Sequence, residues 1–448
     1  MTSTVGLLIG AIMVGTLLLI ISERVHKTLA ALLGAGLALF IAIIPGSIES
    51  NEVLIPDVEH LFKLVELDLV LIIIGITLMV GVASTTGLFE YITLVILKKS
   101  GYNQYKLLTS LCFLTMVFSA FLDAYMAIII ISSITIVGCE ALEINPKPYI
   151  LAEAIFADLG GTMTRIASPP NLIIGGHFDI DFVTFFILTA PYVLLASILS
   201  LLVWQYVFRK DLSKPISKYK YDQILLIDEK TVITDPKQFR RSALILILTI
   251  IGFVVASFLP LELELGYIAM AGGFAMVGFV EPNVDEAVKK IEWSLVFFLV
   301  SLLILMGLAE TVGILELIAT PIESLFESNL FVGTISLTWI NALASAVLDN
   351  VPVATIMTEV MDQVLEAYPL TPFYPLLVSV VIGTNLGGNI TPIGSASTIQ
   401  AIIILERIEK KEAKTSFKEF LKIGSFVTSF QLLIATFYIS LLWMIFGS

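Results

Sequence analysis

Long apolar runs recur along the whole chain and constrain its fold more than any other feature. Runs near 20 residues match the ~30 Å hydrocarbon core of a bilayer. The chain has 448 residues, of which 57% are hydrophobic and only 14% charged, and no soluble domain of this length has such a composition. A lipid-facing β-barrel would show alternating ten-residue strands instead. The sequence therefore predicts an all-α polytopic membrane protein. Examples of the runs are Val5–Ile21, Thr28–Ile44, Leu69–Val80, Pro191–Val207 and Ala243–Leu259.

Breaks in hydropathy predict ten crossing segments and two longer apolar stretches. The stretches 107–139 and 331–366 are 33 and 36 residues long, and each has a polar interruption, SAFLDA or SAVLDN, in its middle. The halves on either side of each interruption are too short to cross alone, so each stretch is predicted to be a re-entrant helical hairpin. The predicted crossings are 4–22, 28–46, 68–97, 149–175, 182–208, 242–259, 266–280, 294–320, 374–402 and 422–446.

The basic residues give the orientation. Of the 25 Lys and Arg residues, 23 lie in loops that share one side if the N-terminus is outside. This positive-inside pattern places both termini outside and is typical of a protein of the plasma membrane. The outer loops carry acidic residues instead. The basic loops are 23–27, 98–106, 140–148, 209–241, 281–293 and 403–422.

The chain is also internally repeated. GVASTTGLFE, from residue 81, aligns with GLAETVGILE at an offset of 226, and SAFLD aligns with SAVLD at the same offset. DLGGTMTRIAS, from residue 158, aligns with NLGGNITPIGS at an offset of 227. Each unit has five crossings and one hairpin, and five is odd, so the second unit is inverted. We therefore predict repeats at 1–208 and 242–448, joined by a cytoplasmic linker at 209–241.

One crossing in each repeat, 149–175 and 374–402, is predicted to be a broken helix. Gly160 and Gly161 interrupt the first, whereas Gly387, Gly388 and Pro392 interrupt the second. Unwinding in lipid exposes backbone groups at a cost of several kcal/mol each, so a break survives only in protein or beside a watery cavity. Freed carbonyls can hold a cation, and the next half-helix offers N–H donors to an anion. Two such half-sites near the bilayer centre indicate a secondary transporter.

Asp123 and Asp349 occupy matching positions in the two hairpin tips. A central aspartate is costly in a membrane, so a matched pair suggests that both bind a cation or exchange a proton. Alternatively, each aspartate caps the second half-helix of its hairpin. Both roles can hold together. A sodium ion bound by these carboxylates and nearby backbone carbonyls is the one bound ion that the sequence suggests, and no other cofactor is expected.

Arg165 is the basic residue placed inside the membrane at the first break, where its counterpart is Pro392. It either attracts an anionic substrate or forms a buried ion pair with Asp158, Asp123 or Glu153. Neutral residues at the breaks are candidate ligands, although each could instead bond its own helix backbone. These neutral candidates are Thr162, Thr164, Ser168, Asn171, Asn389, Thr391, Ser395 and Ser397.

The segments SAFLD, LGGTMTRIASPPNLII, SAVLDNVPVA and NLGGNITPIGS resemble the ion transporter superfamily, in particular its arsenite permease and P protein branch. Sodium–proton antiporters and divalent anion–sodium symporters are related branches. The resemblance implies an elevator-type transport domain and a scaffold that forms a homodimer. It also implies a site composed of Ser119, Asp123, Thr162, Thr164 and Asn171 from the first repeat, with Ser345, Asp349, Asn350, Asn389, Thr391 and Ser395 from the second.

The first half-site departs from the pattern of that branch. Ala124 stands where the branch usually has Asn, and Ser168 stands where it usually has Asp. The loss of a carboxylate and the presence of Arg165 favour a small anion or oxyanion, inorganic, metalloid or carboxylate, moved with a sodium or proton gradient. A sodium–proton antiporter is the alternative, and a channel is a weaker one because breaks in both repeats favour alternating gates.

The sequence does not indicate an enzyme. The three histidines, His26, His60 and His177, fall in predicted loops, and neither a HExxH motif nor a phosphate-binding GxxxxGK[ST] loop is present. The expected partners are a small-molecule or ion substrate, the lipid bilayer and a second copy of the chain, with no nucleic acid.

Overall fold

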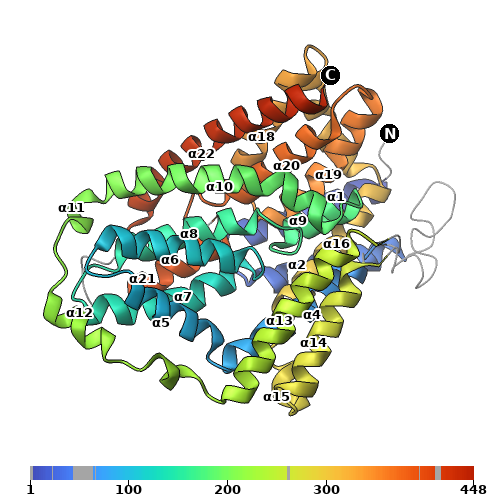
Figure 1. The fold of residues 1–448 in the computed structure, drawn as a ribbon. Helices are drawn as coiled ribbons and strands as arrows, with labels where there is room; N and C mark the ends of the chain where they lie inside the picture. Colours follow the sequence, from blue (N-terminus) through green and yellow to red (C-terminus); the bar gives the residue numbers. More distant parts are fainter. Residues whose placement is uncertain are drawn as a thin grey trace.

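The fold is helical throughout the part that the computed structural model describes, which is residues 4–22, 24–43, 64–65, 67–259, 263–392, 394–408 and 415–447 (Figure 1). Seven helices in this part are apolar and long enough to span a membrane. The predicted all-helical membrane fold is confirmed. The seven are α1 (Thr4–Ser22), α4 (Leu67–Thr85), α7 (Ala124–Ala141), α10 (Phe182–Val207), α13 (Pro236–Ala256), α16 (Trp293–Thr311) and α22 (Phe417–Phe446).

The same order of helices occurs twice, as two inverted repeats. The order α1, α2, α4 to α10 in the first repeat corresponds to α13, α14, α16 to α22 in the second. In the first repeat the remaining helices are α2 (Lys27–Ala42), α5 (Leu88–Lys99), α6 (Gln104–Ser119), α8 (Lys147–Gly161) and α9 (Pro169–His177). In the second they are α14 (Leu265–Phe279), α17 (Ile314–Glu323), α18 (Leu330–Ser345), α19 (Asn350–Ala367), α20 (Phe373–Gly387) and α21 (Ala396–Arg407).

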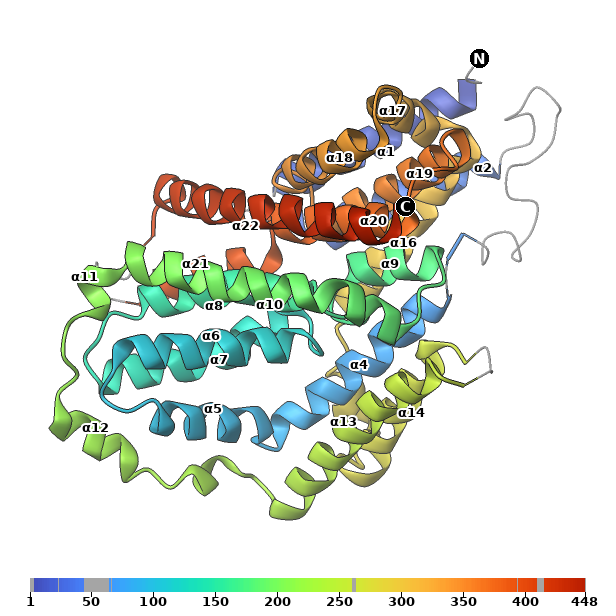
Figure 2. The ribbon, with the colours of Figure 1, turned by 45° about the horizontal axis from the view of Figure 1, so that its top comes forward.

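The helices form two groups. We call α1, α2, α4, α13, α14 and α16 the frame helices: α14 packs along α4 and α2 packs along α16, so each pair joins the two repeats. We call α6 to α10 and α18 to α22 the hairpin bundle, in which α6 packs on α8 and α18 packs on α20. The hairpin α6–α7 and the hairpin α18–α19 enter the molecule from opposite ends (Figure 2). The two groups meet around the hairpin tips.

The start of α1 and the end of α22 lie toward one end of the molecule, and the linker lies toward the other (Figures 1 and 2). The linker contains two short helices, α11 (Arg209–Leu212) and α12 (Lys218–Leu225). Helix α13 begins at Pro236, inside the predicted linker, because the Asp235 side chain accepts a hydrogen bond from the Lys237 amide at 2.7 Å and caps the helix there.

Two predicted crossings, 68–97 and 294–320, are each divided into two helices. Gly87 separates α4 from α5 with a φ of 79°, and Gly313 separates α16 from α17 with a φ of 74°. Only glycine adopts this left-handed conformation readily, so the helix turns at these positions. The expectation that hairpin arms are too short to cross was also wrong for α7, which has 18 residues.

Candidate functional site

Each hairpin tip ends in an aspartate that caps the following helix. The Oδ1 atom of Asp123 accepts a hydrogen bond from the Tyr125 amide at 2.8 Å, and Oδ1 of Asp349 accepts one from the Val351 amide at 3.3 Å. The predicted capping role is therefore confirmed for both residues. In each case this bond uses one carboxylate oxygen, and the other oxygen is left for further interactions.

A serine at the end of the first arm of each hairpin donates a hydrogen bond to the broken helix of the same repeat. The Ser119 hydroxyl donates to the Ala157 carbonyl of α8 at 2.6 Å, and the Ser345 hydroxyl donates to the Thr384 carbonyl of α20 at the same distance. Ala157 and Thr384 are related by the sequence offset of 227. Both serines were predicted as ligands, and in this structure their protons are engaged in holding each tip in place.

A threonine after each break donates a second hydrogen bond, from the broken helix back to the hairpin tip. Thr164 donates its hydroxyl proton to the Ala120 carbonyl at 2.5 Å, and Thr391 donates to the Ala346 carbonyl at 2.7 Å. The unwound segments therefore satisfy carbonyls at the ends of α6 and α18, which have no partners within their own helices. Each tip and break form one hydrogen-bonded unit.

The breaks approach the hairpins closely because they begin with glycine. A Cβ atom at Gly160 would lie 2.2 Å from the Met116 carbonyl oxygen, and one at Gly387 would lie 2.3 Å from the Ala342 carbonyl oxygen. No real Cβ tolerates such a contact, so these positions require glycine. The first glycine of each Gly-Gly pair therefore has a packing role besides ending its helix.

The second half of each broken helix packs against the other repeat. Helix α21 packs on α7 and α8 of the first repeat, whereas α9 packs on α19 and α20 of the second. Ser395 and Ser397 at the start of α21 donate to the two carboxylate oxygens of Asp158 at 2.8 and 2.7 Å. In the matching contact, Ser168 donates to Oδ1 of Asn385 at 3.0 Å.

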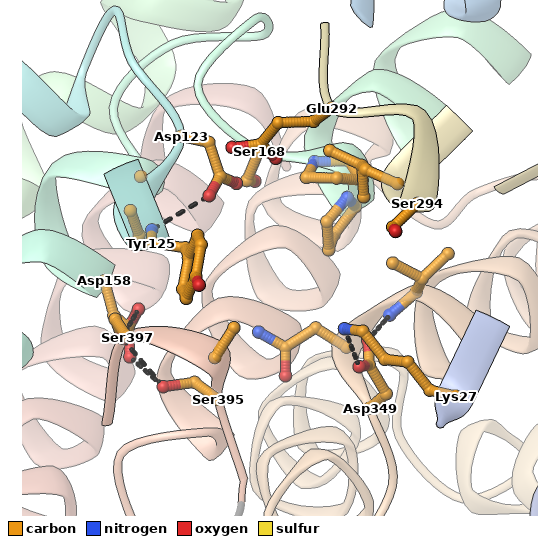
Figure 3. Close-up of a pocket in the computed structure, with 18 of the residues that line it drawn as sticks. Lys27, Asp123, Tyr125, Asp158, Ser168, Glu292, Ser294, Asp349, Ser395 and Ser397 are labelled. Carbon is orange, nitrogen blue, oxygen red and sulfur yellow. Dashed lines mark hydrogen bonds and ion pairs between the residues drawn. The ribbon is translucent and has the colours of Figure 1, made fainter. Parts of the chain in front are cut away.

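A cavity of about 630 Å³ lies where the tips, the breaks and the frame helices meet (Figure 3). Six helices begin at its wall, so their positive dipole ends lie beside the cavity. This convergence is the strongest sign of a binding site in the described part of the chain. The residues that begin these helices and line the cavity are Lys27 (α2), Ala124 (α7), Pro169 (α9), Trp293 (α16), Asn350 (α19) and Ala396 (α21).

Four carboxylates line the same cavity: Asp123, Asp158, Glu292 and Asp349. Figure 3 shows Asp123 and Glu292 on one side and Asp349 with Lys27 on the other. Glu292 and Lys27 were not among the predicted site residues because both fall in predicted loops. The repeat alignment pairs Asp158 with Asn385, but Asp158 was predicted only as a partner of Arg165.

Lys27 crosses the boundary between the two helix groups. Its Nζ atom donates to Oδ2 of Asp349 at 2.8 Å and lies 4.9 Å from the centre of the Phe298 ring. Lys27 belongs to the frame, whereas Asp349 belongs to the hairpin bundle. No signal in the sequence connects Lys27 with this aspartate, because the two residues are 322 positions apart.

The structure brings six of the predicted candidate residues to the cavity wall, namely Asp123, Ser168, Asp349, Asn350, Ser395 and Ser397. The others lie behind the wall. Thr162 donates to the Asp158 carbonyl of its own helix at 2.9 Å, and Asn171 donates to the carbonyls of Gly161 and Thr164. The role of all these residues as ligands stays a prediction.

Arg165 and Asn389 are both buried but differ in their contacts. The Arg165 guanidinium donates to the Ile180 carbonyl at 2.8 Å and does not line the cavity. Neither side-chain polar atom of Asn389 has a hydrogen-bond partner among the described residues. Arg165 therefore gives no direct attraction for an anion in this conformation, whereas Asn389 retains its full bonding capacity at the second break.

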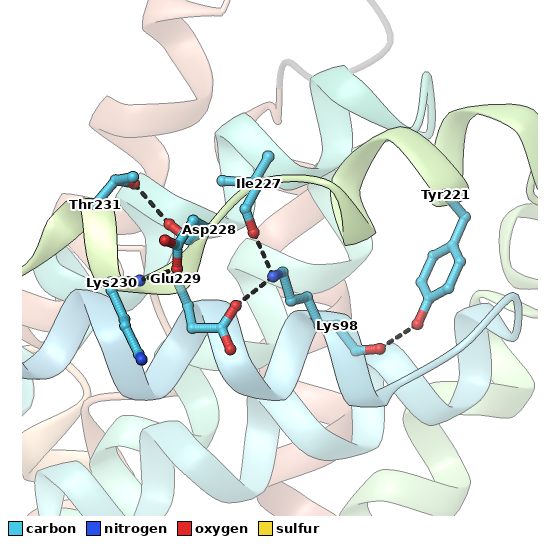
Figure 4. Close-up of polar contacts among 7 residues, drawn as sticks. All are labelled: Lys98, Tyr221, Ile227, Asp228, Glu229, Lys230 and Thr231. Carbon is cyan, nitrogen blue, oxygen red and sulfur yellow. Dashed lines mark hydrogen bonds and ion pairs between the residues drawn. The ribbon is translucent and has the colours of Figure 1, made fainter.

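A second polar cluster lies on the linker, apart from the cavity (Figure 4). The Lys98 ammonium at the end of α5 bonds the Glu229 carboxylate and the Ile227 carbonyl, and its own carbonyl accepts from Tyr221. The hydrogen bond from Lys98 lowers the pKa of the partly exposed Glu229 carboxyl below its ordinary value. The linker is thus attached by polar contacts to the helix that follows Gly87.

A polar cavity at which six helices begin, inside an all-helical membrane protein made of inverted repeats, defines a membrane transporter. A family model described as the citrate transporter family matches residues 17–373. The chain belongs to this family.

Relatives with the same general character cover most of the chain. It is 24% identical to a 46 kDa membrane protein of Mycobacterium leprae over 96% of this chain and 97% of that protein. It is 25% identical to the uncharacterized transporter Rv2684 of Mycobacterium tuberculosis over 96% of each chain. It is 28% identical to the P protein of Mus musculus over 92% of this chain. The matched region covers 57% of the length of that P protein. The predicted superfamily is confirmed.

Two solved transporters share the fold. The YdaH transporter of Alcanivorax borkumensis superposes with a TM-score of 0.57 at 13% identity, covering 88% of this chain and 90% of that one. MtrF of Neisseria gonorrhoeae, described as one of a class of antimetabolite efflux pumps, superposes with a TM-score of 0.54 at 12% identity, covering 92% of each chain. At this identity the likeness concerns the fold alone.

Proposed function

We propose that the protein is a secondary active transporter that moves a small carboxylate or oxyanion together with sodium ions or protons. The observation that carries the proposal is the cavity at which six helices begin and which four carboxylates line. Helix N-termini bind anions, and carboxylates bind cations or protons. The same cavity therefore offers groups that could bind both the anion and the cation that is transported with it.

The charge of the cavity supports coupling between the anion and a cation. Four carboxylates face it, and Lys27 and His26 are its basic residues within the described chain. Two like charges 4 Å apart repel by about 4 kcal/mol at an effective dielectric constant of 20. An anion that enters alone meets this repulsion, whereas sodium ions or protons bound to the carboxylates remove it. The name of the citrate transporter family supports a carboxylate as the first substrate to test.

The boundary between the frame and the hairpin bundle supports an elevator-type movement. Each tip is bonded to its own break, so the bundle can move as one body past the frame. In this proposal the frame stays fixed in the plasma membrane, with both termini outside, and forms the homodimer contact. The movement exposes the cavity to each side of the membrane in turn.

A sodium–proton antiporter is the second candidate, and a specific observation favours it. The cavity's carboxylates outnumber its basic groups among the described residues, and Asp349, which pairs with Lys27, matches Asp123, for which the described part of the chain shows no ion pair. Competition between sodium and protons for such carboxylates would exchange the two ions without any anion.

Uptake by proteoliposomes tests the proposal. We expect saturable uptake of radiolabelled citrate, succinate, sulfate, phosphate or arsenite, driven by an inward sodium or proton gradient and stopped when ionophores collapse that gradient. Sodium-induced pH changes with no other solute present would instead establish the antiporter. Uptake that neither saturates nor follows a cation gradient would overturn both and indicate a channel.

A further inference from the structure

The ion pair between Lys27 and Asp349 joins a frame helix to a hairpin tip inside the cavity. Lys27 is the first residue of α2, and Asp349 caps α19. The pair is held at 2.8 Å, and the ring of Phe298 on α16 supports the ammonium from the frame side. Movement of the hairpin bundle past the frame must break this contact.

The pair is accessible from the cavity. The side chain of Lys27 is 38% exposed and that of Asp349 is 24% exposed, so water and small ions reach both groups. The second carboxylate oxygen of Asp349 is engaged by the Val351 amide. The lysine ammonium therefore occupies the open oxygen, where an incoming cation would bind.

We propose that Lys27 occupies the cation position of the second half-site, and that a transported monovalent metal cation must displace it from Asp349. The proposal rests on the proposed function, because it concerns the coupling cation of that transporter. Without the cation, the ion pair adds a contact between the hairpin bundle and the frame that must break each time the bundle moves. With the cation bound, the ammonium is released and the bundle is free to move.

The pairing has a measurable effect on cation affinity. A ligand that binds only the fraction of molecules whose site is open shows an apparent Kd equal to the intrinsic Kd divided by that fraction. If Lys27 occupies Asp349 nine-tenths of the time, its removal tightens sodium binding about tenfold. A purely structural ion pair would affect the melting temperature and leave the sodium affinity unchanged.

The test measures sodium binding to the purified full-length chain. The midpoint temperature of thermal unfolding is measured at increasing sodium chloride concentrations, with choline chloride added to keep the ionic strength equal. We expect Lys27→Gln to lower the apparent Kd for sodium about tenfold, and Lys27→Arg to retain the wild-type value. In the Asp349→Asn background, Lys27→Gln should have no such effect. Lys289→Gln is the matched control, because it removes the same charge from an exposed position whose partner is Glu286.

The outcomes separate this inference from the proposed function. A sodium affinity that is unchanged or weaker in Lys27→Gln overturns the inference, even where wild-type uptake is normal. A tenfold tighter affinity that disappears with Asp349→Asn supports it, even where no anion is taken up and the anion transport proposal fails. If Lys27→Gln does not fold, Lys27→Met in the same titration decides the question on the same criteria.

Discussion

In the first repeat, Ser119 and Thr164 bond the hairpin tip to its broken helix, and in the second repeat Ser345 and Thr391 make the same bonds. The glycines that let each break approach its hairpin are also matched. The two half-sites therefore share the contacts that define their shape. The two half-sites differ instead in which of their matched positions carry a charge.

Asp158 in the first repeat corresponds to Asn385 in the second, and Arg165 corresponds to Pro392. Asp349 pairs with Lys27, whereas Asp123 has no ion pair among the described residues. Packing contacts must be kept in both copies because both must close the same tip-to-break geometry. Charged groups are free to differ, and this difference can give the two half-sites separate roles.

The largest expected effect comes from removing the tip carboxylates. We expect Asp123→Asn and Asp349→Asn each to reduce coupled uptake at least about 30-fold, because each change removes a charged ligand of the proposed coupling cation, a loss of about 2 kcal/mol. Both variants should fold, because an asparagine oxygen still accepts the capping bond. Uptake is measured in proteoliposomes with Asp211→Asn, on the exposed linker, as control. Normal uptake in Asp349→Asn would remove that residue from the mechanism.

The next largest effect is a difference in stability between alanine substitutions at Gly87 and Gly313, the glycines at the two helix turns. Both have positive φ, so alanine costs about 1–2 kcal/mol at either position. At Gly87 the new Cβ would also lie 1.9 Å from the Val232 carbonyl oxygen, whereas at Gly313 the nearest atom is 3.6 Å away. We expect Gly87→Ala to lower the melting temperature clearly more than Gly313→Ala. Equal shifts would show that the linker yields at Gly87.

The glycines at the breaks should instead behave alike in the two repeats. Gly160→Ala and Gly387→Ala each force a Cβ against a hairpin carbonyl, and overpacking of this kind costs about 1–3 kcal/mol. The control is Gly15→Ala in α1, where no atom lies within 4 Å of the new Cβ. Thermal unfolding of the purified variants gives the comparison. A large effect in one repeat and none in the other would contradict the shared packing.

A smaller effect is expected at Arg165. Its guanidinium bonds the Ile180 carbonyl and does not line the cavity, so Arg165→Gln should change anion affinity less than twofold. The glutamine amide can donate to the same carbonyl, so we expect the free energy of unfolding to fall by about 1 kcal/mol. Concentration dependence of uptake measures the affinity. A selective loss of anion affinity would show that Arg165 reaches the substrate in another conformation.

The sequence predicted the all-helical fold, the hairpins and the breaks because Gly, Pro and Asp interrupt long apolar runs, and such interruptions are local signals. It also placed Asp123 and Asp349 at matching tips. It did not predict Lys27 or Glu292 in the cavity, since their positions follow from how the frame packs on the bundle. The turns at Gly87 and Gly313 were missed although polar residues precede both glycines, Ser84 to Thr86 in the first repeat and Glu310 and Thr311 in the second, and a glycine after such residues is a helix-end signal.

The smallest expected effect concerns pH and the linker. The hydrogen bond from Lys98 lowers the pKa of Glu229, so the folded carboxylate stays ionised to lower pH than the unfolded one. Its contribution is present at neutral pH and is lost as the pH falls below about 4.3 and through the lowered folded value. We expect the protection of residues 218–232 against hydrogen exchange to fall between pH 5 and pH 3 more in the wild type than in Glu229→Gln, which has already lost the charge. Comparing the two proteins at each pH cancels the intrinsic pH dependence of exchange, and identical profiles would show that this pair does not hold the linker.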